Sequence, residues 1–344
     1  MDEGAVLGLD VGGAHVKTAR ADGAGVRAAT RAFPLWQDPG GLVDALRAAA
    51  AAVDGERAPA VAVTMTAELA DCFETKAQGV AFVLDAVASA FPGREVLVFH
   101  ADAGFWPADR ARRDPLAVAS ANWRATAELV ARTAGDAWLL DVGSTTTDVV
   151  PVVGGAVAAV GRTDPDRLAA GELVYTGAVR TPACAILRRV TVNGRRYRVA
   201  AEWFAVAGDA HLWLGDLDPE AYAGPTPDGR GKSRAEAGAR LARMVCADRT
   251  IWSDDAVTAI ARAIAAAQVR AIAGAVREVR ARLGARAPTR AVVVGAGAFL
   301  GARAARRAGL RTVPAPEPFR GEGSRAAPAV AVACLCREAL GRRP

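Results

Sequence analysis

Two segments of this 344-residue chain repeat one pattern, and that repeat limits the folds open to it. The first is LGLDVGGAHVKTA, which begins at Leu7, and the second is WLLDVGSTTTDVV, which begins at Trp138. Each has an apolar run, the tripeptide Asp-Val-Gly, a short polar turn and a second strand-like run, a pattern typical of a β-hairpin. Such a repeat predicts two domains of similar topology, which we expect to face each other across a central cleft.

The segments that follow the first repeat alternate between strand and helix patterns. β-Branched and apolar runs at 60–66 and 95–100 predict strands. Amphipathic runs at 78–91 and 122–135 predict helices. This alternation is typical of an α/β layered domain.

The second half of the chain carries additional elements. Asn193-Gly194 is a strong hairpin signal, and the Gly-, Pro- and Asp-rich run at 215–233 predicts a surface loop. Helical patterns follow at 234–248 and 254–283, and the second can be capped by Ser253 or Asp254. We therefore predict a first domain at 1–136, a second at 137–326 with an insertion at 184–285, and a C-terminal closing helix at 327–344.

Composition favours a cytoplasmic protein with small-molecule partners. The net charge is +6, but only three of the 43 basic residues are lysines. The arginines recur on helical patterns, where a solvated face explains them, so we expect no nucleic-acid partner. The five cysteines form no CxxC pair, which argues against a zinc site or a disulfide framework. With no signal sequence and no apolar run of membrane-spanning length, we expect no membrane partner; the oligomeric state stays open.

The glycines of the two repeated turns suggest an anion-binding role. Tight turns at Gly12-Gly13 and at Gly143 can aim backbone N–H groups at phosphate oxygens. Lys17 adds a positive charge, and hydroxyls add further donors. These hydroxyls belong to Ser144, Thr145 and Thr146.

The carboxylates of the same turns need a different role, because they repel phosphate. Hard carboxylate oxygens suit Mg²⁺, which keeps water and bridges to phosphate. Asp10 and Asp141 are therefore candidate metal ligands, and Asp10 and Asp148 are candidate catalytic groups. The plain alternative is that both turns only connect strands, but two matching turns favour phosphate binding.

A third glycine turn, VVVGAGAF with Gly295 and Gly297, completes a set of three. In this order the turns resemble the two phosphate loops and the nucleoside loop of the actin, sugar-kinase and heat-shock-70 superfold. That resemblance implies an α/β chain of two ribonuclease-H-like domains facing a central cleft. It also makes ATP a possible ligand.

A narrower resemblance rests on longer motifs. TMTAELADCF, HADAGFW, ANWRATA, GRTDPDRLAAGELVYTGAVRTP and AEWFAVAGDAHLWLGDLDP are similar to the hydantoinase/oxoprolinase-related family tied to tetrahydromethanopterin-linked one-carbon transfer, whose characterised branch acts in methanofuran biosynthesis. The resemblance implies a transferase. An aminomethylfuran carbinol diphosphate would condense with the phenol of tyramine or γ-glutamyltyramine and release diphosphate. ATP would then not be required.

The implied reaction needs a base for the phenol and groups that position the substrates. His15, Asp148 and Asp209 are candidate bases, and Asp209 and His211 would share a face if their segment were extended. Candidate substrate contacts follow strand ends, where turn or helix-start charges are the plain alternative. These residues are Glu68, Asp71 and Asp102.

Two other functions stay open at this point. An ATP-dependent small-molecule kinase or an amide-ring hydrolase would use the third glycine turn for a nucleoside. A non-enzymatic switch would bind nucleotide or diphosphate without turning anything over.

Overall fold

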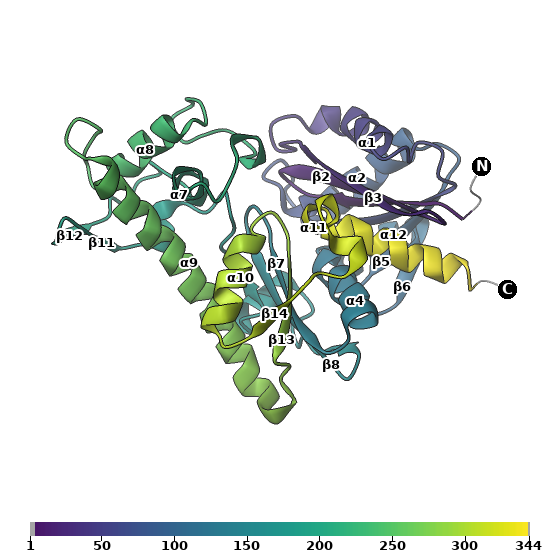
Figure 1. Cartoon of the computed structure of the whole chain (residues 1–344). Helices are drawn as coiled ribbons and strands as arrows, with labels where there is room; N and C mark the ends of the chain where they lie inside the picture. The colour runs from purple at the N-terminus through teal and green to yellow at the C-terminus, as the bar shows by residue number, and fades with distance from the viewer. Residues whose placement is uncertain (1–3, 343–344) are drawn as a thin grey trace. The chain divides into compact units, whose positions relative to one another are not determined.

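The computed structural model describes residues 4–342, which divide into two compact units (Figure 1). Unit 1 takes the chain up to Leu139, then Val150–Asp166, and the C-terminal segment from Pro314. Unit 2 takes Leu140–Val149 and Arg167–Val313. The sequence boundaries at 136 and 326 differ from this division, because two later segments pack with the N-terminal unit.

Unit 1 is built on a six-stranded sheet with the order β3-β2-β1-β4-β5-β6. Strand β1 pairs antiparallel with β2 and parallel with β4, and β4 pairs parallel with β5. Three antiparallel strands followed by parallel ones give the ribonuclease-H-like topology that the sequence predicts. The strands are β1 (Val6–Val11), β2 (His15–Asp22), β3 (Gly25–Ala32), β4 (Ala60–Met65), β5 (Glu95–His100) and β6 (Gly104–Pro107).

Helices bury the apolar side chains of this sheet in one large core. The C-terminal helix α12 (Ala327–Leu340) packs on β1, β2, β4 and α4 (Asn122–Ala134), and Figure 1 shows this yellow helix beside the purple N-terminal strands. A Cβ at Gly8 of β1 would lie 2.2 Å from the carbonyl oxygen of Ala329, so glycine is what allows this close approach. The helices are α1 (Leu42–Ala51), α2 (Lys76–Ala90), α3 (Ala108–Arg113), α4 (Asn122–Ala134), α11 (Glu322–Arg325) and α12 (Ala327–Leu340).

The second repeat forms a sheet with the order β10-β8-β7-β13-β14, which matches the β3-β2-β1-β4-β5 order of the first. The strands are β7 (Ala137–Val142), β8 (Thr147–Val153), β10 (Leu173–Val174), β13 (Arg290–Val294) and β14 (Arg311–Val313), with β9 (Ala156–Val157) paired to β8. The predicted two-fold repeat is therefore confirmed at the level of strand order. Helices α5 (Asp164–Ala169) and α10 (Ala298–Arg307) belong to the same half of the chain.

The predicted insertion is present in unit 2 as a hairpin and helices with their own apolar core. Asn193 and Gly194 have φ of 49° and 75°, as the two-residue turn requires. Ser253 accepts from the N–H of Ala256 and so caps the long helix. The elements are α6 (Ala183–Ile186), β11 (Arg189–Val192), β12 (Arg195–Arg198), α7 (Ala207–Leu214), α8 (Arg234–Arg243) and α9 (Asp254–Leu283).

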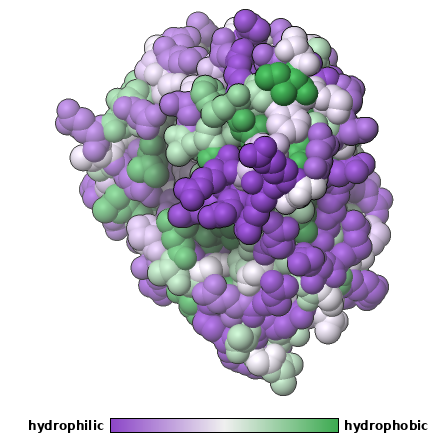
Figure 2. Space-filling view, turned by 90° about the vertical axis from the view of Figure 1, so that its left-hand side faces the viewer, coloured by the Kyte–Doolittle hydropathy of each residue, from purple (hydrophilic) through white to green (hydrophobic). Residues whose placement is uncertain are grey.

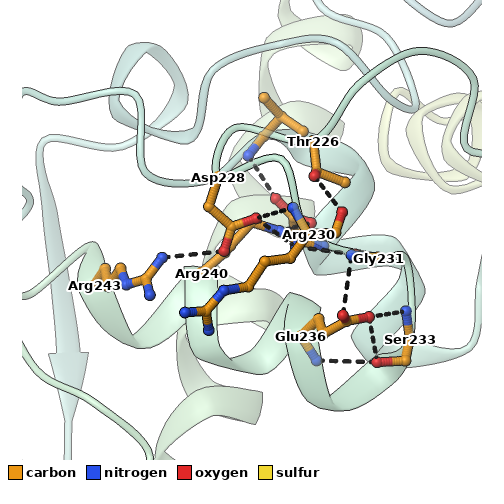
Figure 3. Close-up of polar contacts among 10 residues, drawn as sticks. Thr226, Asp228, Arg230, Gly231, Ser233, Glu236, Arg240 and Arg243 are labelled. Carbon is orange, nitrogen blue, oxygen red and sulfur yellow. Dashed lines mark hydrogen bonds and ion pairs between the residues drawn. The ribbon is translucent and has the colours of Figure 1, made fainter.

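A network of polar contacts orders the end of the predicted surface loop (Figure 3). Asp228 accepts from Arg240 and Arg243, at 3.0 and 3.1 Å. Ser233 and Glu236 form a capping box at the start of α8, and Glu236 also accepts from the N–H of Gly231. These contacts tie the loop to α8, because each of them joins a loop residue to that helix or to its cap.

Helix α9 is the one candidate membrane span among residues 4–342, by length and composition alone. Half of its apolar window is buried inside the protein, where α9 packs against α7, α8 and α10. Figure 2 shows many hydrophilic side chains on the side of the molecule that carries α8 and the β11–β12 hairpin. Arg277, Arg282 and Arg286 are exposed, as predicted for the arginines of this region.

Candidate functional site

The first repeated turn lies at the carboxyl end of β1. The N–H of Gly12 donates to the carbonyl of His15 over 2.9 Å and closes the turn. Thr66, the residue after β4, donates its N–H to the carbonyl of Val11. The chain therefore brings the ends of β1 and β4 to the same edge of the sheet, where ligand sites of open α/β sheets occur.

Asp10 and Lys17 form a pair beside this turn. Lys17 Nζ lies 3.0 Å from Asp10 Oδ2, and the Asp10 side chain is 1% exposed. Oδ1 of Asp10 is buried and has no hydrogen-bond partner within residues 4–342. The sequence assigned the lysine to phosphate and the aspartate to a metal; the structure adds a direct contact between them.

The second turn has the same backbone hydrogen bond. The N–H of Gly143 donates to the carbonyl of Thr146 over 2.9 Å, as Gly12 does to His15. The side chains of Ser144 and Thr145 lie together, with 3.5 Å between their hydroxyl oxygens. The equivalence of the two turns is therefore one of geometry as well as sequence.

Gly177 to Arg180, which lie in the motif GRTDPDRLAAGELVYTGAVRTP, support this second turn. The N–H groups of Val179 and Arg180 donate to the carbonyl of Ser144, at 3.0 and 2.8 Å. A Cβ at Gly177 would lie 2.5 Å from backbone atoms of Ser144 and Thr145. Gly177 is thus required for close backbone approach, and its place in the motif YTGAVRTP was the available signal.

The third glycine turn packs against the end of β7. The N–H of Gly297 donates to the carbonyl of Val142 over 2.8 Å. A Cβ at Gly295 would lie 2.3 Å from that carbonyl and 2.6 Å from Oδ1 of Asp141. Packing within unit 2 therefore explains both glycines, independently of any nucleoside.

Two of the predicted bases are bound to buried arginines. Asp148 Oδ1 accepts from Arg167 over 2.8 Å, and the arginine side chain is 1% exposed. Asp209 Oδ1 accepts from Arg240 over 2.8 Å, and neither side chain is exposed. Each carboxylate therefore has a structural partner in unit 2.

The segment that carries Asp209 and His211 is helical, which corrects the extended conformation considered for it. Both residues lie in α7 and are fully buried. Oδ2 of Asp209 accepts from the N–H of Val206 and caps the helix, while Nε2 of His211 lies 2.9 Å from Oε1 of Gln268. Side chains two residues apart lie on the same face of a strand, but a helix has 3.6 residues per turn. The side chains of Asp209 and His211 therefore point in different directions.

The remaining predicted side chains differ in exposure. His15 is half-buried on β2, and Asp71 is exposed. Asp102 is 47% exposed and lies 3.6 Å from Arg162. Its N–H donates to Nδ1 of His100, whose pKa is lowered by burial. These positions keep Asp71 and Asp102 accessible to a ligand.

Glu68 is fully buried and belongs to a polar cluster that the sequence did not reveal. Ser120 donates its hydroxyl to Oε1 of Glu68 over 2.5 Å. Lys76 Nζ lies 3.2 Å from that hydroxyl and 3.2 Å from Asp164. Burial raises the pKa of Glu68 against the opposing effects of Ser120 and Lys76. Ser120 directly precedes the motif ANWRATA, and Asp164 lies in the motif GRTDPDRL. These two motifs were the only sequence signals for the cluster.

Residues 4–342 contain no group of three or more His, Cys, Asp or Glu side chains that could hold a metal ion. The two predicted ligands, Asp10 and Asp141, belong to different units. The buried, unpartnered Oδ1 of Asp10 still fits Mg²⁺, which commonly uses one or two carboxylates together with water and substrate phosphates.

The family model for hydantoinase/oxoprolinase matches residues 59–339. The chain belongs to the hydantoinase/oxoprolinase family. The match begins just before β4, so it includes the second repeat and the insertion and leaves β1, β2, β3 and α1 outside.

Two curated proteins match the chain. The chain is 38% identical over 251 residues to the (4-{4-[2-(γ-L-glutamylamino)ethyl]phenoxymethyl}furan-2-yl)methanamine synthase of Methanocaldococcus jannaschii, covering 73% of this chain and 74% of that protein. It is 36% identical over 117 residues to the synthase of the same name from Methanococcus vannielii, covering 34% and 52%.

Among solved structures, the chain resembles nucleotide-free acetone carboxylase. The TM-score is 0.52 at 11% identity, over 95% of this chain and 70% of that one. This likeness concerns the fold alone, and it agrees with the ribonuclease-H-like strand order.

Proposed function

We propose that the chain is a transferase that joins an aminomethylfuran carbinol diphosphate to the phenol oxygen of γ-glutamyltyramine or tyramine. The observation that carries the proposal is the 38% identity over 251 residues to a synthase. The name of that synthase describes a furan linked through a phenoxymethyl ether to a γ-glutamylaminoethyl group. A synthase that completes this product by joining its furan and phenol parts forms the aryl ether bond.

The reaction breaks one carbon–oxygen bond and forms another. The bond between the furfuryl carbon and the diphosphate oxygen breaks, and diphosphate leaves with the electron pair. The furan ring stabilises the positive charge on the carbon, and the phenol oxygen attacks it. The protein must stabilise the leaving diphosphate, position the phenol and accept its proton.

The two repeated turns supply the donors that a diphosphate needs. Backbone N–H groups around Gly12-Gly13 and the hydroxyls of Ser144, Thr145 and Thr146 suit phosphate oxygens. Lys17, held against Asp10, adds a positive charge at the first turn. We propose each turn, within its own unit, as a phosphate-binding loop.

We propose Asp10 in unit 1 and Asp141 in unit 2 as Mg²⁺ ligands, because carboxylate oxygens suit this ion. When bound, the ion would neutralise charge on the departing diphosphate. Asp10 supports this assignment because its buried Oδ1 has no partner within residues 4–342. The residues of the chain then act by binding and orienting the diphosphate.

The substrate contacts and the cellular setting belong to the same proposal. Asp71 and Asp102 are accessible and can bind the ammonium groups of the two substrates. The small, polar substrates agree with a cytoplasmic enzyme that acts on small molecules.

The experiment that tests the proposal is a direct assay. The purified chain is incubated with Mg²⁺, synthetic aminomethylfuran carbinol diphosphate and γ-glutamyltyramine, and the ether and diphosphate are measured by mass spectrometry and a coupled assay. Equal amounts of ether and diphosphate are expected without ATP. Asp10→Asn should lower the rate by at least about 10²-fold. Asp44→Asn, an exposed aspartate of the same unit, is the matched control.

Thermal unfolding separates this function from a kinase or an ATP-dependent hydrolase. With Mg²⁺, diphosphate at 100 times its dissociation constant should add about 2.7 kcal/mol of stability. That corresponds to a shift of about 5 °C for a chain of this size. Stabilisation by ATP or ADP well beyond diphosphate, or ether formation that requires ATP, would contradict the proposal.

A further inference from the structure

Four side chains from separate segments of unit 1 form a hydrogen-bonded chain. Lys76 Nζ lies 3.2 Å from the hydroxyl of Ser120, and that hydroxyl donates to Oε1 of Glu68 over 2.5 Å. Lys76 also lies 3.2 Å from Asp164 and 3.8 Å from Glu68. The contacts give one continuous path from the ammonium of Lys76 to the carboxylate of Glu68.

This path runs from a partly exposed end to a buried end. The side chains of Lys76 and Asp164 are 25% and 24% exposed. Ser120 is 8% exposed and the Glu68 side chain is not exposed at all. Oε2 of Glu68 is buried without a hydrogen-bond partner among the described residues. Lys76 is therefore accessible to a ligand, whereas Glu68 is not.

The backbone positions of Lys76 and Ser120 are both unfavourable for these residue types. Lys76 is the first residue of α2, where the helix dipole disfavours a positive charge. Ser120 has φ of 51°, a conformation that is unfavourable for a residue other than glycine. If these two residues only packed, an acidic or neutral residue in place of Lys76 and a glycine in place of Ser120 would make the protein more stable. Such unfavourable features are concentrated at functional sites.

The path lies at the same edge of the sheet as the first glycine turn. Glu68 follows β4 by three residues, in a short turn of 3₁₀ helix, Ala67–Leu69. The N–H of Thr66 bonds to the carbonyl of Val11, directly before the Gly12-Gly13 turn. The glycine turn that we propose for the diphosphate follows β1, and Glu68 follows β4. The two therefore lie after neighbouring strands of the sheet.

The two carboxylates that the sequence analysis named as bases are less suited to accept a proton than Glu68, which it named as a substrate contact. Asp148 and Asp209 each accept a hydrogen bond from a buried arginine, which cannot release its own proton. Glu68 has a hydroxyl and a lysine as neighbours, and both of these can pass a proton.

From these contacts we infer that Glu68 is the final acceptor of the proton that the phenol loses, and that Lys76 and Ser120 conduct it; this inference rests on the proposed function. The phenol gives its proton to Nζ of Lys76 while Lys76 gives one to the hydroxyl of Ser120 and Ser120 gives its own to Glu68. The phenol oxygen then forms the bond to the furfuryl carbon as diphosphate leaves. After product release the proton returns to water by the same path.

Glu68→Gln tests the acceptor while keeping the hydrogen bond from Ser120. The expected result is a fall in kcat of about 10²-fold or more with KM for both substrates nearly unchanged. The wild-type kcat should fall at low pH, because Glu68 then becomes protonated beside Lys76 and Asp164. In Glu68→Gln the kcat should not show this fall at low pH.

A more acidic phenol provides a readout that a purely structural role would not affect. Ring-fluorinated tyramine loses its proton more easily, so it should recover much of the rate lost in Glu68→Gln while changing the wild type little. An equal loss with both phenols, or an unchanged kcat with tyramine, would overturn the inference.

Two variants test the conducting residues separately. Ser120→Gly removes the hydroxyl at a φ that glycine prefers. The relief of backbone strain offsets the lost hydrogen bond to Glu68, so the melting temperature should change little while kcat falls about as much as in Glu68→Gln. Lys76→Arg keeps the positive charge beside Asp164 but cannot release a proton, so it should also lower kcat. Activity close to wild type in both variants would contradict the path.

The assay distinguishes this inference from the proposed function. If the wild-type chain forms no ether and releases no diphosphate, the proposed function fails. If the wild type forms ether and Glu68→Gln does so at the same rate, only the proton path fails.

Discussion

Nε of Arg240 donates to Oδ1 of Asp209 over 2.8 Å, and both side chains are fully buried. The same guanidinium reaches Asp228 over 3.0 Å and the carbonyl of Gly231 over 3.1 Å. Asp209 therefore connects α7 to α8 and to the loop before it, through one arginine. This contact gives a predicted catalytic residue a clear structural role.

Asp209→Asn should lower the stability of the protein substantially. Removing one partner of a buried ion pair typically costs about 3–5 kcal/mol, because the other charge is left buried. The melting temperature measured by calorimetry should fall by about 6 °C or more. Asp218→Asn, at an exposed position of the following loop, should change it by less than 2 °C, about the effect of 0.5 kcal/mol. A stable but inactive Asp209→Asn protein would instead favour the catalytic assignment.

Gly177→Ala should disturb the second repeated turn. The new Cβ would lie 2.5 Å from backbone atoms of Ser144 and Thr145, where nothing flexible can move away. We expect a loss of stability of about 1–3 kcal/mol and weaker stabilisation by Mg²⁺ and diphosphate in thermal unfolding.

The matched control for that variant is Gly274→Ala in α9, where an added Cβ meets nothing within 4 Å. Because alanine favours a helix over glycine, this change should stabilise the protein by up to about 1 kcal/mol. Equal effects of the two substitutions would show that the turn does not depend on close backbone approach at Gly177.

Because of Asp216, the free energy of unfolding should decrease as the pH is lowered in the acid range. Burial alone would raise its pKa, but hydrogen bonds and charge from His211 and Arg303 lower it well below the usual 3.8. The group therefore contributes stability above pH 3.8 that is lost as the pH falls through its lowered pKa.

Asp216→Asn tests this dependence by urea unfolding at several pH values. At pH 7 the variant should be less stable by about 1.5–3 kcal/mol, the cost of charge-assisted hydrogen bonds. Below pH 3.8 the difference from wild type should narrow. A difference that stays constant down to pH 3 would contradict the lowered pKa.

Lys17→Met should destabilise the first unit because it removes a cation from beside the buried Asp10. The double variant Asp10→Asn, Lys17→Met should recover part of that loss, since a neutral amide costs less to bury than an unpaired carboxylate. Chemical denaturation of the four proteins gives the coupling energy. Additive effects would show that the contact at 3.0 Å contributes nothing to stability.

Several particular features could be predicted from the sequence. The paired hairpins, the Asn193-Gly194 turn and the Ser253 cap all depend on local backbone preferences, and each is present in the structure. The family could also be identified, because its motifs are long and specific. The site assignments for the turns remain proposals.

Other features depended on which distant residues come into contact. Glu68, Lys76, Ser120 and Asp164 lie on four segments, and nothing local in the sequence joins them. The arginine partners of Asp148 and Asp209 could not be predicted from the sequence for the same reason.

The sequence by itself determined the repeated hairpins, the alternation of strands and helices and the family, because local hydrogen bonding and hydrophobic periodicity act over a few residues. Only the tertiary structure decided that α12 returns to β1 and that Asp209 is held by a buried arginine. It likewise decided that Glu68 lies at the end of a hydrogen-bonded chain. These features arise from packing between segments far apart in the chain, where burial and charge pairing set the chemical behaviour of a side chain.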